Sequence, residues 1–131
     1  MEHLELVKLM AQTLYDRKGF DILALDVRNL TVICEYMVIA TGRNANHVQS
    51  LADAVDDKMA ENGYFLKRSE GASDGRWIVL DYGDIMLHVF HQEERKYYNL
   101  ERLWNDGTNK IDLTFDESED DAPFLQPPSD K

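Results

Sequence analysis

Three acidic residues within five positions, Asp53, Asp56 and Asp57, are the first candidates for chemistry in this 131-residue chain. Transfer of a nucleotidyl group requires carboxylates that converge on magnesium, which aligns and neutralises the phosphates. The usual arrangement has a Gly-Ser pair at a helix start and an Asp-x-Asp pair on a later strand. Here residues 41–43 (Thr-Gly-Arg) stand in place of Gly-Ser, and the three aspartates fall inside an expected helix. The residues for this chemistry are therefore incomplete, and a nucleotide- or metal-dependent enzyme is kept only as an alternative to a protein that acts by binding.

The histidines and the single cysteine are the next candidates. His88 and His91 have an H-x-x-H spacing, but on a strand this odd separation points them to opposite faces, so they do not easily share a metal ion. His47, near a helix start, is interpreted as structural rather than as a general base. Cys34 has no nucleophile signature around it and is interpreted as a small buried apolar residue. The sequence thus predicts no catalytic residue, no metal site and no cofactor.

Composition restricts the class of protein further. The chain is 44% hydrophobic and 30% charged, as in ordinary globular domains. It has no apolar run near the roughly 18 residues of a membrane helix and no visible secretory signal. A single cysteine cannot form an internal disulfide. These features predict a cytoplasmic protein that does not bind membranes.

The net charge of −11 is unevenly distributed. Residues 105–131 contain 8 acids and 2 bases, a net charge of −6, whereas residues 1–104 carry −5. Without a basic stretch, extensive direct binding to nucleic acid is not expected. The acidic balance favours a basic protein as partner.

Periodicity predicts the elements that position these residues. Helices are expected where apolar residues recur at three- and four-residue intervals, and strands in short apolar or alternating runs. Asn44 is the expected N-cap of the second helix, and Gly19 and Gly63 are expected helix stops. A tight turn at residues 82–84 should join the last two strands into a hairpin. The expected helices are 2–18, 45–62 and 93–104, and the expected strands are 22–27, 36–41, 64–70, 76–82 and 85–91.

The resulting order, α-β-β-α-β-β-β-α, predicts an α/β fold with a mixed five-stranded sheet and helices packed on it. Residues 36–41 are apolar on both faces, as expected for a central strand. The domain is expected to span residues 1–106. Residues 107–131 are interpreted as an acidic, disordered tail, because residues 116–121 are nearly all acidic and two prolines follow.

Several segments together resemble the ribosomal silencing factor family, also called the Iojap-related family. The resemblance covers about residues 4–106, with the motifs in the family's order. The segments are 24–27 (ALDV), 36–42 (YMVIATG), 47–49 (HVQ), 76–84 (RWIVLDYGD), 88–90 (HVF) and 98–104 (YNLERLW). One departure is Arg43, which stands four positions before His47, whereas the family usually has its arginine directly before this histidine.

This resemblance implies a nucleotidyltransferase-like fold without the corresponding activity. It also implies binding to a ribosomal protein on the intersubunit face of the large ribosomal subunit. Bound there, such a protein sterically blocks joining of the small subunit and represses translation under nutrient limitation. Members of the family commonly form homodimers in isolation.

The expected partner-binding patch is centred on the last hairpin. Trp77, Val79 and Asp81 should share one face of their strand, and tryptophan is a preferred interface anchor because it buries a large rigid area. Arg76 is added, although strand alternation places it on the opposite face. Met86 of the neighbouring strand suits an adaptable surface. The competing interpretation places the tryptophan beneath the third helix and the methionine in the core.

Asp81 and Asp84 flank the hairpin turn, and each has two interpretations. A carboxylate there can accept a charge-assisted hydrogen bond from a partner's Arg or Lys, or it can bond to its own backbone within the turn. The partner role is favoured for Asp81 and the turn role for Asp84. The third expected helix, 93–104, should mainly seal the sheet, and part of it could form a homodimer contact.

Overall fold

The computed structural model describes residues 2–71, 74–98 and 101–116. The core is a mixed five-stranded sheet in the order β1-β2-β5-β4-β3. β2 and β5 pair in parallel, and the other neighbours are antiparallel. The predicted α/β class and mixed sheet are confirmed. The elements are α1 (His3–Asp16), β1 (Phe20–Asp26), β2 (Tyr36–Gly42), α2 (Ala45–Glu61), β3 (Arg68–Glu70), β4 (Trp77–Asp81), β5 (Ile85–His91), α3 (Gln92–Tyr98) and α4 (Glu101–Trp104).

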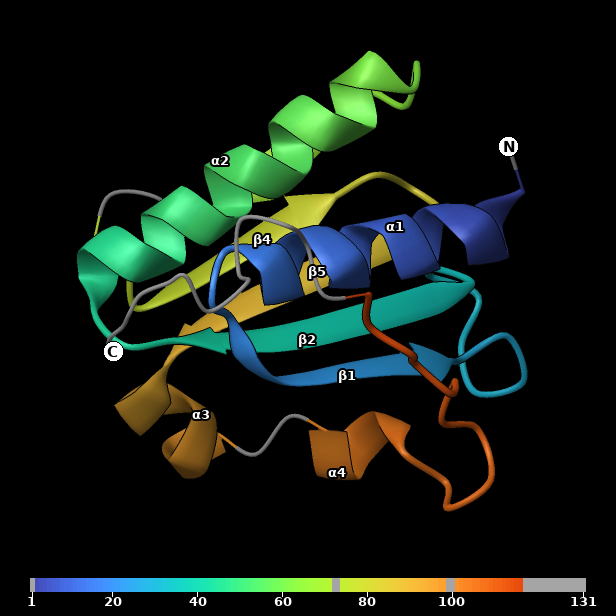
Figure 1. Ribbon diagram of the computed structural model, residues 1–131. Coiled ribbons are helices and arrows are strands. Elements are labelled where there is room, and N and C mark those ends of the chain that lie inside the picture. Colours follow the sequence, from blue (N-terminus) through green and yellow to red (C-terminus); the bar gives the residue numbers. More distant parts are fainter. Residues whose placement is uncertain (1, 72–73, 99–100, 117–131) are drawn as a thin grey trace.

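Helices cover both faces of the sheet. α1 and α2 lie on one face, and α3 and α4 lie on the other, below β1 in Figure 1. Every residue of β2 is buried, as predicted for a central strand covered on both sides. The larger core cluster lies between the sheet and the first two helices, with Val7, Leu51 and Leu87 among its members.

Helix α2 follows its sequence signals closely. Asn44 caps it, with the side-chain oxygen accepting a hydrogen bond from the backbone N–H of His47 at 2.8 Å. Gly63 beyond its C-terminal end has φ of 76°, the left-handed conformation that glycine adopts without strain. After α1, by contrast, Lys18 has the positive φ of 71°. Gly19 is needed there because a Cβ atom would lie 2.9 Å from the carbonyl oxygen of Leu14.

Two predicted elements differ from the structure. The expected strand 64–70 is shortened to β3, because Tyr64 first closes the end of α2 through a hydrogen bond from its N–H to the carbonyl of Met59. The expected helix 93–104 is instead α3 and α4. Residues 99–100 between them lie outside the described residues.

Residues 107–116 pack against the domain, although the sequence predicted that the tail begins at residue 107. Ile111 donates its N–H to the carbonyl of Ala24 at 2.8 Å, and its side chain and that of Leu113 pack against the core. Phe115 stacks on Tyr15 with ring centroids 4.5 Å apart. Apolar residues at alternate positions, 111, 113 and 115, explain this packing of residues 107–116, whereas the acidic residues 117–131 lie outside the described residues.

Candidate protein-binding face

Strand β4 alternates between buried and half-buried side chains. Ile78 and Leu80 point into the core beneath α1 and α2, whereas Trp77, Val79 and Asp81 are half-buried on the opposite side. The predicted common face of these three residues is therefore confirmed. It arises because successive strand residues project to opposite sides of the sheet.

The hairpin register adds three residues of β5 to the same side. Phe90 lies opposite Trp77, His88 opposite Val79, and Met86 opposite Asp81. We call the half-buried Trp77, Val79, Asp81 and Met86, together with the buried His88 and Phe90 beneath them, the Trp77 face. Met86 lies at the edge of this face and is half-buried. The sequence allowed either a surface position or a core position for this methionine, and the structure lies between the two.

Trp77 is held in a fixed orientation. Its indole Nε1 donates a hydrogen bond to Nδ1 of His88 at 3.1 Å. Its ring stacks on Phe90 with centroids 4.8 Å apart. An aromatic side chain that is already oriented loses little conformational entropy when a partner covers it, so it is well suited to act as an anchor.

His88 supports this arrangement from below and was not predicted as part of the patch. Only 6% of the residue is exposed, and burial lowers its pKa to about 4. The imidazole is therefore neutral at pH 7. Since Nδ1 accepts the indole hydrogen bond, Nε2 carries the proton, and this buried atom has no hydrogen-bond partner among the residues that the structure describes. The sequence clue was the placement of a histidine between apolar residues on an expected buried strand.

Asp81 performs the turn chemistry that the sequence assigned to Asp84. One oxygen, Oδ1, accepts a hydrogen bond from the N–H of Gly83 at 2.8 Å. The other, Oδ2, lies 3.3 Å from the guanidinium of Arg68 on β3. The Asp84 side chain instead contacts His3. Asp81 precedes the turn glycine by two residues, the spacing at which an aspartate bonds forward to its backbone.

Arg76 directly precedes β4, and its side chain does not lie on the face that strand alternation predicted. Its guanidinium Nη1 lies 2.9 Å from Oε1 of Glu94 on α3, so the side chain extends toward the helices below the sheet and not toward α1 and α2. The cause is that Arg76 precedes the paired part of β4, where alternation no longer fixes direction. The structure thus brings Arg76 to the same side as Trp77.

The Trp77 face continues into a second, smaller core. Leu25, Met37 and Ile39 of β1 and β2 are buried there, with Trp104 of α4 packed against them. Figure 1 shows α3 and α4 covering this side, mainly below β1. The half-buried residues of β4 lie toward the β3 edge, so the accessible part of the face is the last hairpin.

The residues of the alternative enzyme hypothesis are arranged for other tasks. Asp53 and Asp57 are exposed on α2, whereas Asp56 accepts a hydrogen bond from the hydroxyl of Tyr82 at 2.9 Å. Gly42 packs against α2, since a Cβ there would lie 3.0 Å from the backbone nitrogen of Val48. The three aspartates therefore do not converge on one point.

His47 and Cys34 have the structural roles that the sequence predicted. His47 Nδ1 accepts the N–H of Arg43 at 3.0 Å, and Nε2 lies 2.9 Å from the carbonyl of Arg17. Both ring nitrogens are thus engaged with backbone. Cys34 is buried, and burial, followed by the charge of Asp81, raises the pKa of its thiol to about 11, which disfavours the nucleophilic thiolate.

The fold and this face define the class of protein: an α/β domain with helices on both faces of its sheet and a half-open hairpin surface that carries oriented aromatic side chains. Among the described residues, no helix is long and apolar enough to cross a membrane. Two solved structures share the fold. A crystal structure from Chromobacterium violaceum matches with a TM-score of 0.78 and 37% identity, covering 91% of this chain and 98% of that one. One from Bacillus halodurans matches with a TM-score of 0.74 and 33% identity, covering 85% and 100%.

Sequence comparison gives the family. Residues 1–130 match the family described as "Ribosomal silencing factor during starvation". The ribosomal silencing factor RsfS of Bacillus subtilis is 40% identical over 107 residues, which cover 82% of this chain and 91% of that protein. RsfS of Chromobacterium violaceum is 40% identical over 104 residues, covering 79% and 85%. The chain belongs to the ribosomal silencing factor family, which confirms the resemblance of its motifs and makes it a regulatory factor associated with the ribosome.

Proposed function

We propose that the Trp77 face binds a ribosomal protein on the intersubunit face of the large ribosomal subunit. A protein held there occupies space that the small subunit needs, so it blocks subunit joining and represses translation under nutrient limitation. The mechanism is competition for a surface, and it requires no catalysis. The effect then depends on affinity and on the concentration of the factor.

The observation that carries this proposal is the arrangement of Trp77. The indole is half-buried, fixed by His88 and stacked on Phe90, in the half-open part of the sheet. Binding hot spots are enriched in tryptophan and lie in well-packed surroundings. Val79 and Met86 extend the apolar area, and Asp81 and Arg76 provide charges at its rim, where a partner's polar groups can pair with them.

The charge of the chain supports a basic partner. A net charge of −11 favours encounter with a positively charged protein surface and disfavours extensive contact with RNA phosphates. We further propose that the chain works in the cytoplasm and forms a homodimer in the absence of ribosomes.

Co-sedimentation with isolated ribosomal subunits tests the proposal. The purified protein is mixed with large subunits, with small subunits and with both, and each mixture is separated on a sucrose gradient. The expected result is migration with the large subunit alone and fewer joined ribosomes as protein is added. Protein that stays at the top of every gradient would contradict the proposal, and so would binding that leaves subunit joining unchanged.

The same gradient experiment, carried out with variants, shows whether the Trp77 face is the binding surface. Trp77→Ala should lose binding, whereas Phe65→Ala, which removes an exposed aromatic side chain outside the Trp77 face, should retain it. Equal loss in both variants would mean that the binding site lies elsewhere. Circular dichroism is used to check that both variants are folded.

A further inference from the structure

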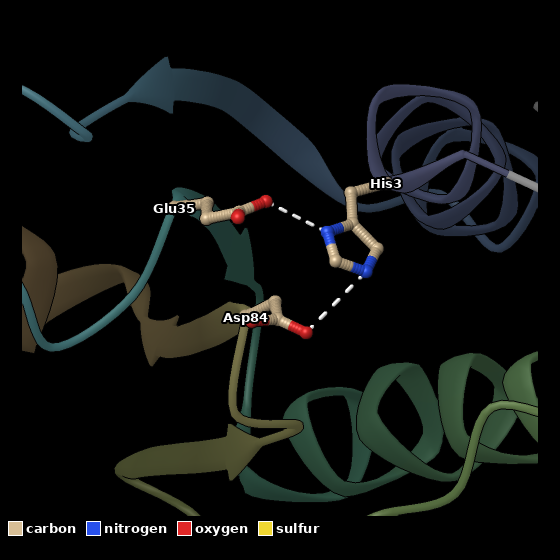
Figure 2. A group of neighbouring side chains, drawn as sticks. All are labelled: His3, Glu35 and Asp84. Atoms are coloured by element: carbon tan, nitrogen blue, oxygen red, sulfur yellow. Dashed lines mark hydrogen bonds and ion pairs between the residues drawn. The ribbon is translucent and has the colours of Figure 1, made fainter.

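A cluster of one histidine and two carboxylates lies at the end of the sheet where β2 begins. His3 is the first residue of α1, Glu35 directly precedes β2, and Asp84 lies in the β4–β5 turn. Figure 2 shows both carboxylates directed at the imidazole ring, each toward a different ring nitrogen. The Nδ1–Glu35 Oε1 distance is 2.7 Å and the Nε2–Asp84 Oδ2 distance is 3.3 Å.

We propose that His3, Glu35 and Asp84 bind a divalent transition metal ion such as Zn²⁺. Their ligand atoms lie within 4.8 Å of one another, and all three side chains are partly exposed, so an ion can enter. Imidazole nitrogens and carboxylate oxygens are both zinc ligands, and three protein ligands leave a fourth position for water. Because the two carboxylates now contact different ring nitrogens, binding requires one of them to rotate toward the nitrogen that holds the ion.

The backbone holds these ligands in place before any ion arrives. The carbonyl oxygen of Asp84 accepts hydrogen bonds from the N–H groups of Glu35 at 2.8 Å and Tyr36 at 3.1 Å. A capping box between Glu2 and Glu5 fixes the first turn of α1, which carries His3. The three ligands therefore come from well-defined segments, and little backbone ordering is needed for binding.

The hydrogen bonds within the cluster indicate a need for positive charge. Both ring nitrogens of His3 face carboxylates, which are acceptors only when ionised. A neutral imidazole carries a single N–H and donates to only one of them, and a cation held by the cluster can pair with the other carboxylate. A bound metal ion supplies that charge and neutralises Glu35 and Asp84 together.

Tyr64 provides an independent polar atom beside the cluster. Its ring lies 6.0 Å from that of His3, and its buried hydroxyl lies beside the backbone of Asp84. Burial, followed by the charges of Asp84 and Glu35, raises the pKa of this hydroxyl to about 12. As a hydroxyl beside the cluster, Tyr64 can donate a hydrogen bond to a water molecule on the ion.

Two physical effects define which ion fits. The N-terminus of α1 carries the positive end of the helix dipole, which modestly opposes any cation, so two carboxylates are needed to outweigh it. The imidazole ligand favours transition metals, whereas Mg²⁺ and Ca²⁺ prefer sites made of oxygen alone. The proposal is independent of the Trp77 face.

Calorimetric titration of the tag-free protein with Zn²⁺ tests the site. The expected result is saturable binding of one ion per chain and a higher melting temperature in its presence. His3→Gln, Glu35→Gln and Asp84→Asn should each weaken binding by at least about tenfold, since even the loss of an outer-shell partner has effects of that size. The matched control is His91→Gln, which removes a surface histidine outside the cluster and should leave binding unchanged.

Nuclear magnetic resonance of the unaltered chain provides a second measurement that does not depend on variant folding. Substoichiometric Mn²⁺ should broaden the amide signals around Glu35, Asp84 and Tyr64 first. The proposal is wrong if Zn²⁺ shows no saturable binding, if binding survives all three ligand substitutions, or if the broadening centres on His91 or on the acidic residues 117–121.

Discussion

The indole Nε1 of Trp77 and the imidazole Nδ1 of His88 are joined by a 3.1 Å hydrogen bond across the β4–β5 hairpin. This bond links a half-buried surface residue to one that is almost completely buried. It fixes the tautomer of the histidine and the direction of the tryptophan at once. The binding surface and the stability of the hairpin are therefore connected through one pair.

Trp77→Ala should weaken binding to the large ribosomal subunit by about 2 kcal/mol or more, the size expected for a central tryptophan anchor. The loss has two sources: the large contact area of the indole disappears, and Nδ1 of His88 loses its donor. Equilibrium binding by fluorescence anisotropy measures the effect, with Phe65→Ala as the control. A folded Trp77→Ala protein that binds with unchanged affinity would remove Trp77 from the interface.

The stability of the protein should decrease on acidification because of His88. Its pKa is about 4 when folded and near 6.5 in the unfolded chain, so the unfolded state binds more protons between these values. The free energy of unfolding is therefore unaffected by the protonation of His88 above pH 6.5. It decreases as the pH falls toward 4, by up to about 3 kcal/mol. Urea unfolding at a series of pH values measures the slope.

The matched variant for this pH effect is His88→Gln, which removes the titrating group and retains a side chain able to accept from the indole. Its absolute stability will differ, so the slopes between pH 4 and 6.5 are compared. Because the carboxylates titrate in both proteins, the difference in slope isolates His88. Identical slopes would show that this histidine does not have the low pKa.

Tyr82→Phe should destabilise the protein by roughly 1 kcal/mol, because it removes the hydrogen bond to Asp56 and leaves a half-buried carboxylate without this donor. The bond links the turn after β4 to α2, so its loss should raise the unfolding rate or lower the folding rate without affecting the Trp77 face. A double-mutant cycle with Asp56→Ala measures the coupling. Additive effects of the two substitutions would mean that the pair contributes nothing.

Asn44→Ala should cost about 1 kcal/mol of stability, the typical value of an N-cap. The side chain of Asn44 accepts the N–H of His47, which is otherwise unpaired within the first turn of α2. Asn46→Ala is the matched control, since this exposed asparagine lies two residues on, within the same turn. Thermal unfolding distinguishes the two, and equal losses would contradict the cap.

Truncation after residue 106 should destabilise the domain, whereas truncation after residue 116 should not. The first removes the backbone bond between Ile111 and Ala24, the apolar contacts of Leu113 and the stacking of Phe115 on Tyr15. Burial of such side chains contributes about 1.5–3 kcal/mol for each that is completely buried, and less here because these are half-buried. Equal melting temperatures for the two truncations would place the domain end at 106, as the sequence suggested.

The sequence determined the elements with strong local periodicity. The apolar stripe of α2, its cap at Asn44 and its stop at Gly63 all act within a few residues, so local physics is sufficient to specify the helix. The two-sided apolar run of β2 and the hairpin turn at Gly83 are local in the same sense. The motifs also identified the family, and the alternation of β4 placed Trp77, Val79 and Asp81 on one face.

Only the tertiary structure decided which elements meet. The parallel pairing of β2 with β5 and the return of residues 107–116 along β1 join distant parts of the chain, and no local period encodes them. For the same reason, no pattern in the sequence indicated that His3, Glu35 and Asp84 would converge. The direction of Arg76 and the exchange of roles between Asp81 and Asp84 were decided at a strand end and a turn, where alternation ceases and hydrogen-bond partners in three dimensions select the conformation.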